Sequence, residues 1–200
     1  MTRAIVVPTC ALVAQLTLAS PLIAQDHSAY DWSQITTLTG LVGAASAESA
    51  DTRATLGGGF GWTLNHWVTV EASGNWLVPR HEDHGFSTDL TAVVNLVRQG
   101  RVIPFVGGGM GLYIASFDTT TGTIPGFYQE RIPEDSAITH RTFTDPMFAF
   151  SAGVDIATQA RWSIRPVVEL KLVTDGSSVY PITIAAVHIT YRFERHGGGG

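Results

Sequence analysis

The stretch RWSIRPVVELKLV (residues 161–173) decides the fold, because its side chains alternate between an apolar parity and a parity that carries charge. The apolar parity holds Trp162, Ile164, Pro166, Val168, Leu170 and Leu172. The other parity holds Ser163, Arg165, Val167, Glu169 and Lys171. A period of two is the side-chain period of a β-strand, so one face is apolar and the other carries charge. The stretch therefore predicts a strand whose two faces meet different surroundings.

The composition of the whole chain indicates where such faces would lie. Charged residues make up 14% of the 200 residues, and Lys171 is the only lysine. Soluble domains usually carry roughly 25% charged residues. A soluble all-β protein of this length would need more charges to cover its outside. The deficit predicts that much of the surface does not face water.

The N-terminal segment has the features of a secretory signal peptide. Arg3 precedes an apolar stretch that runs to Ala24, after which cleavage is expected. A single membrane anchor is the alternative, although Pro8 and Pro21 interrupt the segment. The expected organisation follows in chain order: signal peptide 1–24, N-terminal lead-in 25–33, β-barrel domain 34–195 and glycine tail 196–200.

Charge and cysteine content exclude several classes of function. Cleavage after Ala24 would leave 11 of the 12 basic residues and all 17 acidic ones, which argues against a nucleic-acid partner. The only cysteine, Cys10, lies within the predicted signal peptide. The exported chain would therefore have no disulfide and no thiolate metal site, which suits an oxidising compartment. We expect no cofactor.

Eight segments have the length and alternation of strands. They are residues 34–45, 53–65, 67–78, 87–98, 101–117, 145–157, 161–173 and 181–193. A parity shift between Ile184 and Val187 predicts a β-bulge in the last of them. The connections alternate between tight turns and longer loops, the longest being loop 118–144. In an up-and-down barrel every second connection lies at the same end, so one end should carry only tight turns, as in outer-membrane barrels.

The non-apolar parity is suited to a narrow interior. It is rich in glycine, serine and threonine, and a barrel of eight strands is only wide enough for side chains to fill it. Its few charges nearly balance, which a closed lumen requires because a buried charge is costly unless it is paired. The predicted lumen network comprises Glu71, Asp89, Arg101, Asp155, Arg165, Glu169, Lys171 and Arg192.

Aromatic residues gather near the predicted strand ends. Two belts are expected, formed by Trp62, Trp67, Trp76, Phe117, Trp162, Tyr180, Tyr191 and Phe193. No segment after the signal peptide supplies about 20 apolar residues, so a spanning helix is not expected. A β-rich chain in lipid must close its sheet. The prediction is an all-β, eight-stranded antiparallel up-and-down transmembrane β-barrel.

Other motifs indicate weaker possibilities. The glycine runs at 57–59 and 107–109 lack the following Gly-Lys-Ser/Thr of a phosphate loop. The HEDH cluster at 81–84 lacks the HExxH spacing of a zinc helix, so a solvated loop is the expectation and a weak cation site the alternative. Possible nucleophiles and bases have no diagnostic spacing; they are Ser177, Ser178, His81, His84, His188 and Thr190.

Four segments resemble the small eight-stranded outer-membrane β-barrel family of the OmpA/OmpX type. They are IPFVGGGMGLYIA (103–115), GGGFGWTLNHWVTVEASG (57–74), AGVDIATQARWSIRPVVEL (152–170) and HITYRF (188–193), the last similar to a closing strand with a final aromatic residue. Here Glu-Arg-His and four glycines follow Phe193, which departs from the family pattern. The resemblance implies a role in envelope integrity or surface interaction.

The resulting expectation is a non-enzymatic protein of the bacterial outer membrane with a plugged polar lumen. Its partners would be outer-membrane lipid and lipopolysaccharide, the barrel-assembly machinery, and an extracellular partner through loop 118–144. Two alternatives stay open. One is a lipid-modifying enzyme of the outer membrane, and the other is a soluble periplasmic ligand-binding barrel of the lipocalin type.

Overall fold

The computed structural model describes residues 35–47, 50–80, 83–98, 100–118, 124–132, 140–158 and 161–193. The predicted signal peptide (1–24), lead-in (25–33) and glycine tail (196–200) lie outside these residues. In the described part, no helix is long and apolar enough to cross a membrane.

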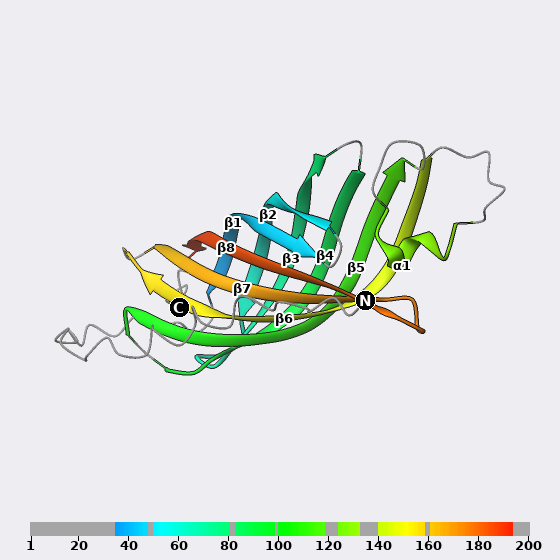
Figure 1. The fold of residues 1–200 in the computed structure, drawn as a ribbon. Helices are drawn as coiled ribbons and strands as arrows, with labels where there is room; N and C mark the ends of the chain where they lie inside the picture. The colour runs from blue at the N-terminus through cyan, green and yellow to red at the C-terminus, as the bar shows by residue number, and fades with distance from the viewer. Residues whose placement is uncertain are drawn as a thin grey trace, which may run out of the picture.

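The chain forms one sheet of eight antiparallel strands, in which each strand pairs with its neighbours in sequence (Figure 1). The strands are β1 (Thr36–Ala47), β2 (Ala50–Thr63), β3 (Val68–Arg80), β4 (Asp83–Asn95), β5 (Val102–Asp118), β6 (His140–Ala157), β7 (Trp162–Thr174) and β8 (Val179–Phe193). The last strand pairs with the first, from Thr36↔Phe193 to Ala47↔Ile182, so the sheet closes into a barrel. The predicted fold class is confirmed.

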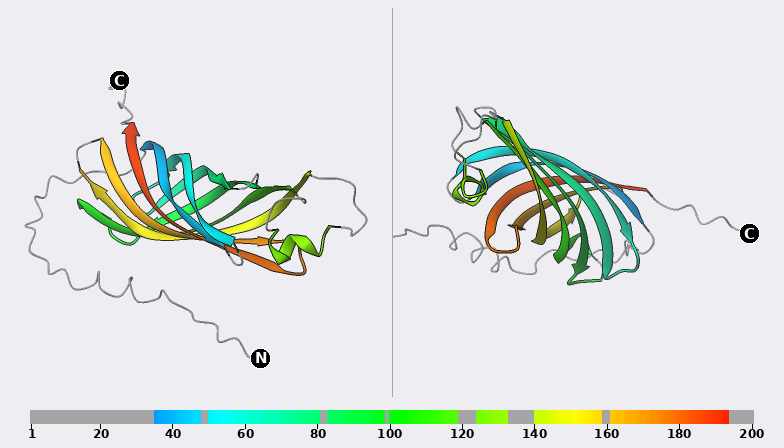
Figure 2. Two further views of the ribbon diagram at one scale, coloured as in Figure 1. Left: turned by 45° about the horizontal axis from the view of Figure 1, so that its top comes forward. Right: turned by 90° about the vertical axis from the view of Figure 1, so that its right-hand side faces the viewer.

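Strand lengths of 12 to 18 residues exceed the 9–11 that a tilted strand needs to cross a bilayer. The two longest strands, β5 and β6, extend beyond the others at one end, where the helix α1 (Gly126–Gln129) lies between them in sequence (Figures 1 and 2). We call this the loop end. The opposite end, at the connections 64–67, 96–101 and 158–161, is called the turn end.

The predicted contrast in connection lengths is wrong at two places. Residues 46–52 and 79–86 are mostly strand, because pairing continues to Ala47↔Ala50 and Arg80↔Asp83. Register shifts at Ala45/Ala47 and Leu77/Arg80 accommodate these tight connections. The long connection between β5 and β6 is therefore the feature that distinguishes the loop end.

The bulge expected between Ile184 and Val187 is also wrong. The register of β8 with β1 and with β7 runs without a shift through this segment. Ile182 and Ile184 face the interior, where they are buried. Apolar side chains thus occupy both faces of β8. In the sequence, this pattern looks the same as a change of parity.

The outward face of the barrel is apolar. Large exposed side chains on it include Leu38, Leu56, Leu90, Met110, Phe148, Phe150, Val168 and Ile189, and Met110 reaches 66% exposure. The inward face holds both a polar network and a set of buried apolar side chains. This arrangement is the reverse of a soluble barrel, in which the apolar side chains of each strand turn inward.

Glycines on the inward face make room for large neighbours. A Cβ on Gly153 would lie 2.8 Å from the ring of Phe105, and one on Gly109 would lie 2.6 Å from the Cα of Thr91. The adjacent Gly108 faces outward, and the nearest atom to its added Cβ is a ring carbon of Phe150 at 4.0 Å. Interior glycines are therefore required by packing, whereas Gly108 has free space.

Gly109→Ala should lower the free energy of unfolding by about 1–3 kcal/mol, because the added methyl group forces β4 and β5 apart. The measurement is the urea midpoint of the refolded barrel in detergent. Gly108→Ala is the matched control, for which we expect little change. Equal urea midpoints for the two variants would show that the interior has room for a methyl group at this level.

Candidate functional site: the lumen and its two plugs

Near the turn end, four charged side chains form a continuous ion-pair network across the lumen. The guanidinium of Arg165 contacts Glu71 Oε1 at 2.6 Å and Asp155 Oδ2 at 3.1 Å. Arg192 Nη2 donates to the second oxygen of Asp155 at 2.9 Å. The Arg165 guanidinium also lies 4.8 Å from the ring centroid of Phe105. Two cations and two carboxylates are thus joined in this layer, which we call the arginine plug.

A second network surrounds Lys171 in the middle of the lumen. Lys171 is 1% exposed, and its Nζ donates to Asp89 Oδ2 at 2.8 Å and to Ser87 Oγ at 2.9 Å. Ser73 and Thr91 donate to the other oxygen of Asp89, at 2.8 and 3.1 Å. Both oxygens of the Asp89 carboxylate therefore accept hydrogen bonds, as a buried carboxylate requires.

Glu169 connects Lys171 to a histidine. Its two oxygens lie 3.6 Å from Lys171 Nζ and 3.5 Å from His188 Nε2. His188 comes from β8 and is directly opposite Arg165 in the register with β7. The network thus links β3, β4, β7 and β8 around the barrel.

A small cavity separates the two networks. It has a volume of ≈ 40 Å³, and its polar lining includes Glu71, Asp89, Arg165, Glu169 and His188. About 10–15 Å³ is needed to hold one water molecule, so only a few waters fit. The cavity is too small for an organic ligand of the usual size.

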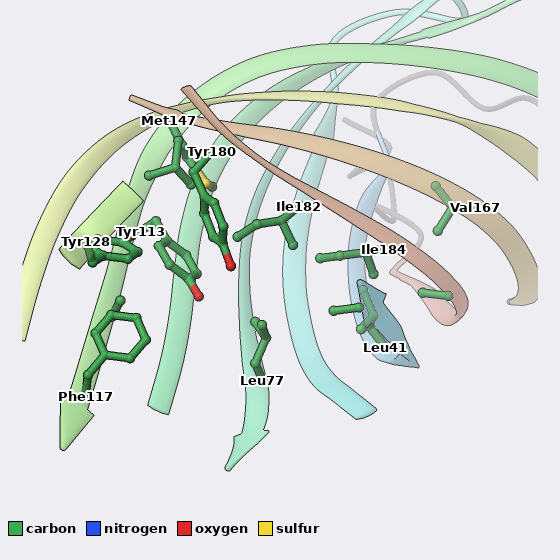
Figure 3. Close-up of a cluster of buried hydrophobic side chains, with 14 of the residues drawn as sticks. Leu41, Leu77, Tyr113, Phe117, Tyr128, Met147, Val167, Tyr180, Ile182 and Ile184 are labelled. Atoms are coloured by element: carbon green, nitrogen blue, oxygen red, sulfur yellow. The ribbon is translucent and has the colours of Figure 1, made fainter. Parts of the chain in front are cut away.

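The loop end of the lumen is filled by aromatic side chains, which we call the aromatic plug: Tyr113, Phe117, Tyr128 and Tyr180 (Figure 3), with Phe127 and Phe143 packed against them. Its centre is Tyr128 of α1, which is completely buried. The Tyr128 ring centroid lies 4.9 Å from that of Phe117 and 5.0 Å from that of Phe143. Phe127 stacks on Tyr180 at 5.6 Å. Helix α1 is therefore held against the barrel mouth by aromatic packing.

Ion pairs surround the aromatic plug. Arg131 contacts Asp145 at 2.9 Å and lies over the Phe143 ring at 4.8 Å. The hydrogen bond to Asp145 raises the pKa of the Arg131 guanidinium. Arg53 contacts Asp83 at 3.2 Å on the other side of the mouth. These pairs fix the end of α1 and the edge of the barrel in one arrangement.

The structure corrects three of the predicted site residues. Arg101 is exposed in the connection before β5, not part of the lumen network, because the strand parity does not continue beyond Val102. Phe117 and Tyr180 are buried in the aromatic plug, not in an outer belt. Both lie on the inward parity of their strands, at a level where the lumen is apolar.

The remaining predicted residues lie as follows. Glu71, Asp89, Asp155, Arg165, Glu169, Lys171 and Arg192 face the lumen in the two networks. Trp62, Trp67, Trp76, Trp162 and Phe193 are exposed on the outside, and Tyr191 is half-buried between Trp162 and Phe193 at 4.9 Å from each ring.

Sequence reasoning missed His188 as a lumen residue, together with the pairs Arg53–Asp83 and Arg131–Asp145. The supposed parity shift in β8 concealed His188. Two residues of the HEDH cluster, His81 and Glu82, lie outside the described part. Within that part, no group of three or more histidine, cysteine or acidic side chains could hold a metal ion.

The candidate nucleophiles have structural partners. The hydroxyls of Ser177 and Ser178 donate to Asp175 Oδ1 at 2.9 and 3.3 Å. Backbone hydrogen bonds from Ser178 and Ser177 lower the pKa of Asp175. Thr190 and His188 face the lumen at a distance from this turn along β8. The two serines therefore close the β7–β8 turn.

Arg165→Met should destabilise the barrel by about 3–5 kcal/mol, because it leaves buried carboxylates without their partner. Arg101→Met is the matched control and should leave stability within about 0.5 kcal/mol, as expected of a surface position. Both are measured by urea midpoint in detergent. A normal midpoint for Arg165→Met would mean that the ion pairs in the lumen contribute little.

Tyr128→Ala should release α1 without opening the barrel, because the lost contacts all lie in the aromatic plug. We expect at least about a tenfold faster tryptic cleavage after Arg131, following the dependence of proteolysis on local opening. Glu130→Ala, at an exposed neighbouring position, is the control. Unchanged cleavage in Tyr128→Ala would contradict the docking of α1 through this side chain.

No protein-family model and no curated protein sequence matches the chain. Solved structures do. Neisserial surface protein A (NspA) matches with a TM-score of 0.58 and 12% identity over 80% of this chain and 96% of its own. The N-terminal β-barrel domain of Pseudomonas aeruginosa OprF matches with a TM-score of 0.57 and 15% identity over 80% of this chain and 98% of its own. The Yersinia pestis attachment invasion locus protein Ail matches with a TM-score of 0.53 and 13% identity over 80% of this chain and 99% of its own. The chain therefore has the fold of the small eight-stranded outer-membrane β-barrels.

Proposed function

We propose that the protein is an integral barrel of the bacterial outer membrane that is exported through its N-terminal segment 1–24. The outward face carries the argument. It exposes large apolar side chains on strands around the barrel, while the charged side chains of the same strands pair inside. Such a surface is stable in lipid and would aggregate in water.

The lumen suits a structural role and not a channel. The arginine plug, the Lys171 network and the aromatic plug follow one another along the barrel axis. Each is joined by contacts that a permeating solute would have to break. We infer a non-enzymatic protein whose barrel is a rigid support and whose lumen does not conduct freely.

The loop end is the surface that we assign to partners. Glu130, which directly follows helix α1, is exposed to solvent, and the rest of the 119–139 connection adds Glu134 and Asp135. Ail has been crystallised with the heparin analogue sucrose octasulfate. The connections at the loop end of this chain carry six carboxylates and one arginine, so they favour a cationic partner over a sulfated one.

Two further partners follow from the proposed location. Lipopolysaccharide and phospholipid would cover the outward face, and the barrel-assembly machinery would insert the chain. The closing strand β8, with Phe193 exposed at its end, presents the terminal aromatic residue that resembles the family's closing strand.

The alternatives are less well supported by the geometry. A soluble barrel of the lipocalin type needs an internal ligand cavity, whereas the cavity between the two charged networks has a volume of ≈ 40 Å³, and another, lined by Arg53, Tyr113 and Pro125, has a volume of ≈ 20 Å³. A lipid-modifying enzyme needs a nucleophile within reach of a base. Asp175 accepts hydrogen bonds from both Ser177 and Ser178, and these bonds lower its pKa, so its carboxylate is a weak base and alanine at either serine should leave lipid A acylation unchanged.

The location is tested by fractionation followed by electrophoresis in SDS with and without boiling. We expect the protein in the outer-membrane fraction, with a band that shifts on boiling because the closed barrel resists SDS until heated. A soluble periplasmic band without a shift would contradict the proposal. It would favour the ligand-binding alternative, and the search would then turn to small hydrophobic ligands.

A further inference from the structure

The charges of the two lumen networks do not balance. Together, the arginine plug and the Lys171 network join four carboxylates to three cations that stay charged at neutral pH. The carboxylates are Glu71, Asp89, Asp155 and Glu169, and the cations are Arg165, Lys171 and Arg192. A carboxylate enclosed without a matching cation is costly. The two networks therefore carry one negative charge in excess.

This excess charge lies at Glu169. The other three carboxylates each have a cationic nitrogen within 2.9 Å. Glu169 lies 3.6 Å from Lys171 Nζ, which makes a shorter contact of 2.8 Å with Asp89. The second contact of Glu169 is with His188 Nε2, at 3.5 Å. Since Lys171 is engaged mainly by Asp89, His188 is the group that is placed to neutralise Glu169.

The imidazole of His188 is suited to carry that charge. His188 is only 8% exposed, and among the described residues neither of its ring nitrogens has a hydrogen-bond partner. It lines the ≈ 40 Å³ cavity together with Glu169. A neutral imidazole has one N–H donor, whereas the protonated ring has a donor on each nitrogen and a positive charge. Protonation would therefore convert the 3.5 Å contact with Glu169 into a charge-assisted hydrogen bond.

The other groups around His188 leave room for this charge. The adjacent strand β1 places Leu41 opposite His188, and the adjacent strand β7 places Arg165 opposite it. Arg165 would repel a protonated ring, but its own charge is engaged by two carboxylates at 2.6 and 3.1 Å. β2 and β5 face this level with glycines and Phe105. The remaining charged groups are Glu71 of β3, Asp89 of β4, Asp155 of β6, Glu169 and Lys171 of β7, and Arg192 of β8.

We propose that His188 is the fourth cation of the lumen, so that the folded barrel holds one proton on the Glu169–His188 pair that the unfolded chain has lost at neutral pH. A histidine in an unfolded chain releases its proton near about pH 6.5, whereas carboxylates titrate well below that pH. Above about pH 6.5 the unfolded state then binds fewer protons than the folded state, so the free energy of unfolding decreases as the pH rises. The stabilisation is fully present on the acidic side and is lost on the alkaline side.

The test is urea unfolding of the exported chain, refolded in detergent, at about pH 6.5 and about pH 8. One linked proton changes the unfolding equilibrium constant by up to about tenfold per pH unit. We expect this constant, at a fixed urea concentration, to be about fivefold or more larger at the higher pH. His66→Gln changes an exposed histidine of the turn end and is the matched control, which should keep the wild-type dependence.

Two variants distinguish a role in charge balance from a role in packing. His188→Gln should be less stable than the wild type at the lower pH and should lose the pH dependence. Glu169→Gln leaves three carboxylates and three cations, so it should also lose the pH dependence. Combined as Glu169→Gln/His188→Gln, the two changes should recover stability that His188→Gln alone lacks at the lower pH. A double variant that is less stable than His188→Gln would contradict the charge balance.

The charge of His188 is also read directly in the wild type, from the NMR chemical shifts of the histidine rings in detergent micelles. One ring should stay protonated at about pH 7.5, where an exposed ring such as that of His66 is neutral. Histidine rings that are all neutral at this pH would overturn the proposal, as would an unfolding constant that does not change with pH. A stability that is independent of pH but rises with sodium chloride, and not with choline chloride at matched ionic strength, would show that a metal cation balances Glu169 instead.

Discussion

The hydrogen-bond ladder between β1 and β8 is the contact on which the rest of the structure depends. It joins the first strand to the last along twelve residue pairs, from Thr36↔Phe193 to Ala47↔Ile182. Without it, two strand edges would expose unpaired backbone groups, which lipid cannot solvate. Closure also sets the width of the lumen, because eight strands leave room only for side chains.

That narrow width explains why the interior is divided into layers. A charge in the lumen has no bulk water around it, so each cation must find a carboxylate within reach. Arg165 does so with Glu71 and Asp155, and Lys171 does so with Asp89 and Glu169. Near the loop end, apolar side chains fill the lumen around Tyr128, and the pairs Arg131–Asp145 and Arg53–Asp83 lie at its edge. The polar layers and the apolar layer thus have the same effect, because the side chains of each fill the lumen.

The sequence predicted much of this because every charged residue between Trp162 and Val173 falls on one parity, which places Trp162 outside and Arg165 inside. The alternation of side chains does not predict which way a residue faces where a strand ends or where both of its faces are apolar. Arg101 precedes β5 by one residue and turns outward, and His188 lies among apolar residues on both faces of β8. The sequence predicts an outer belt for Phe117 and Tyr180, because composition cannot show that the lumen is apolar at their level. The docking of α1 depends on contacts between segments distant in sequence, which no local pattern reveals.

The burial of Lys171 has a practical consequence for anyone who handles this protein. It is the only lysine in the sequence, and its ammonium group is enclosed by Asp89 and Ser87. Amine-directed reagents such as succinimidyl esters will therefore find no lysine on the folded barrel, and only the α-amino group will react. The unfolded chain exposes a second amine, so the stoichiometry of coupling reports directly on whether a given preparation has folded.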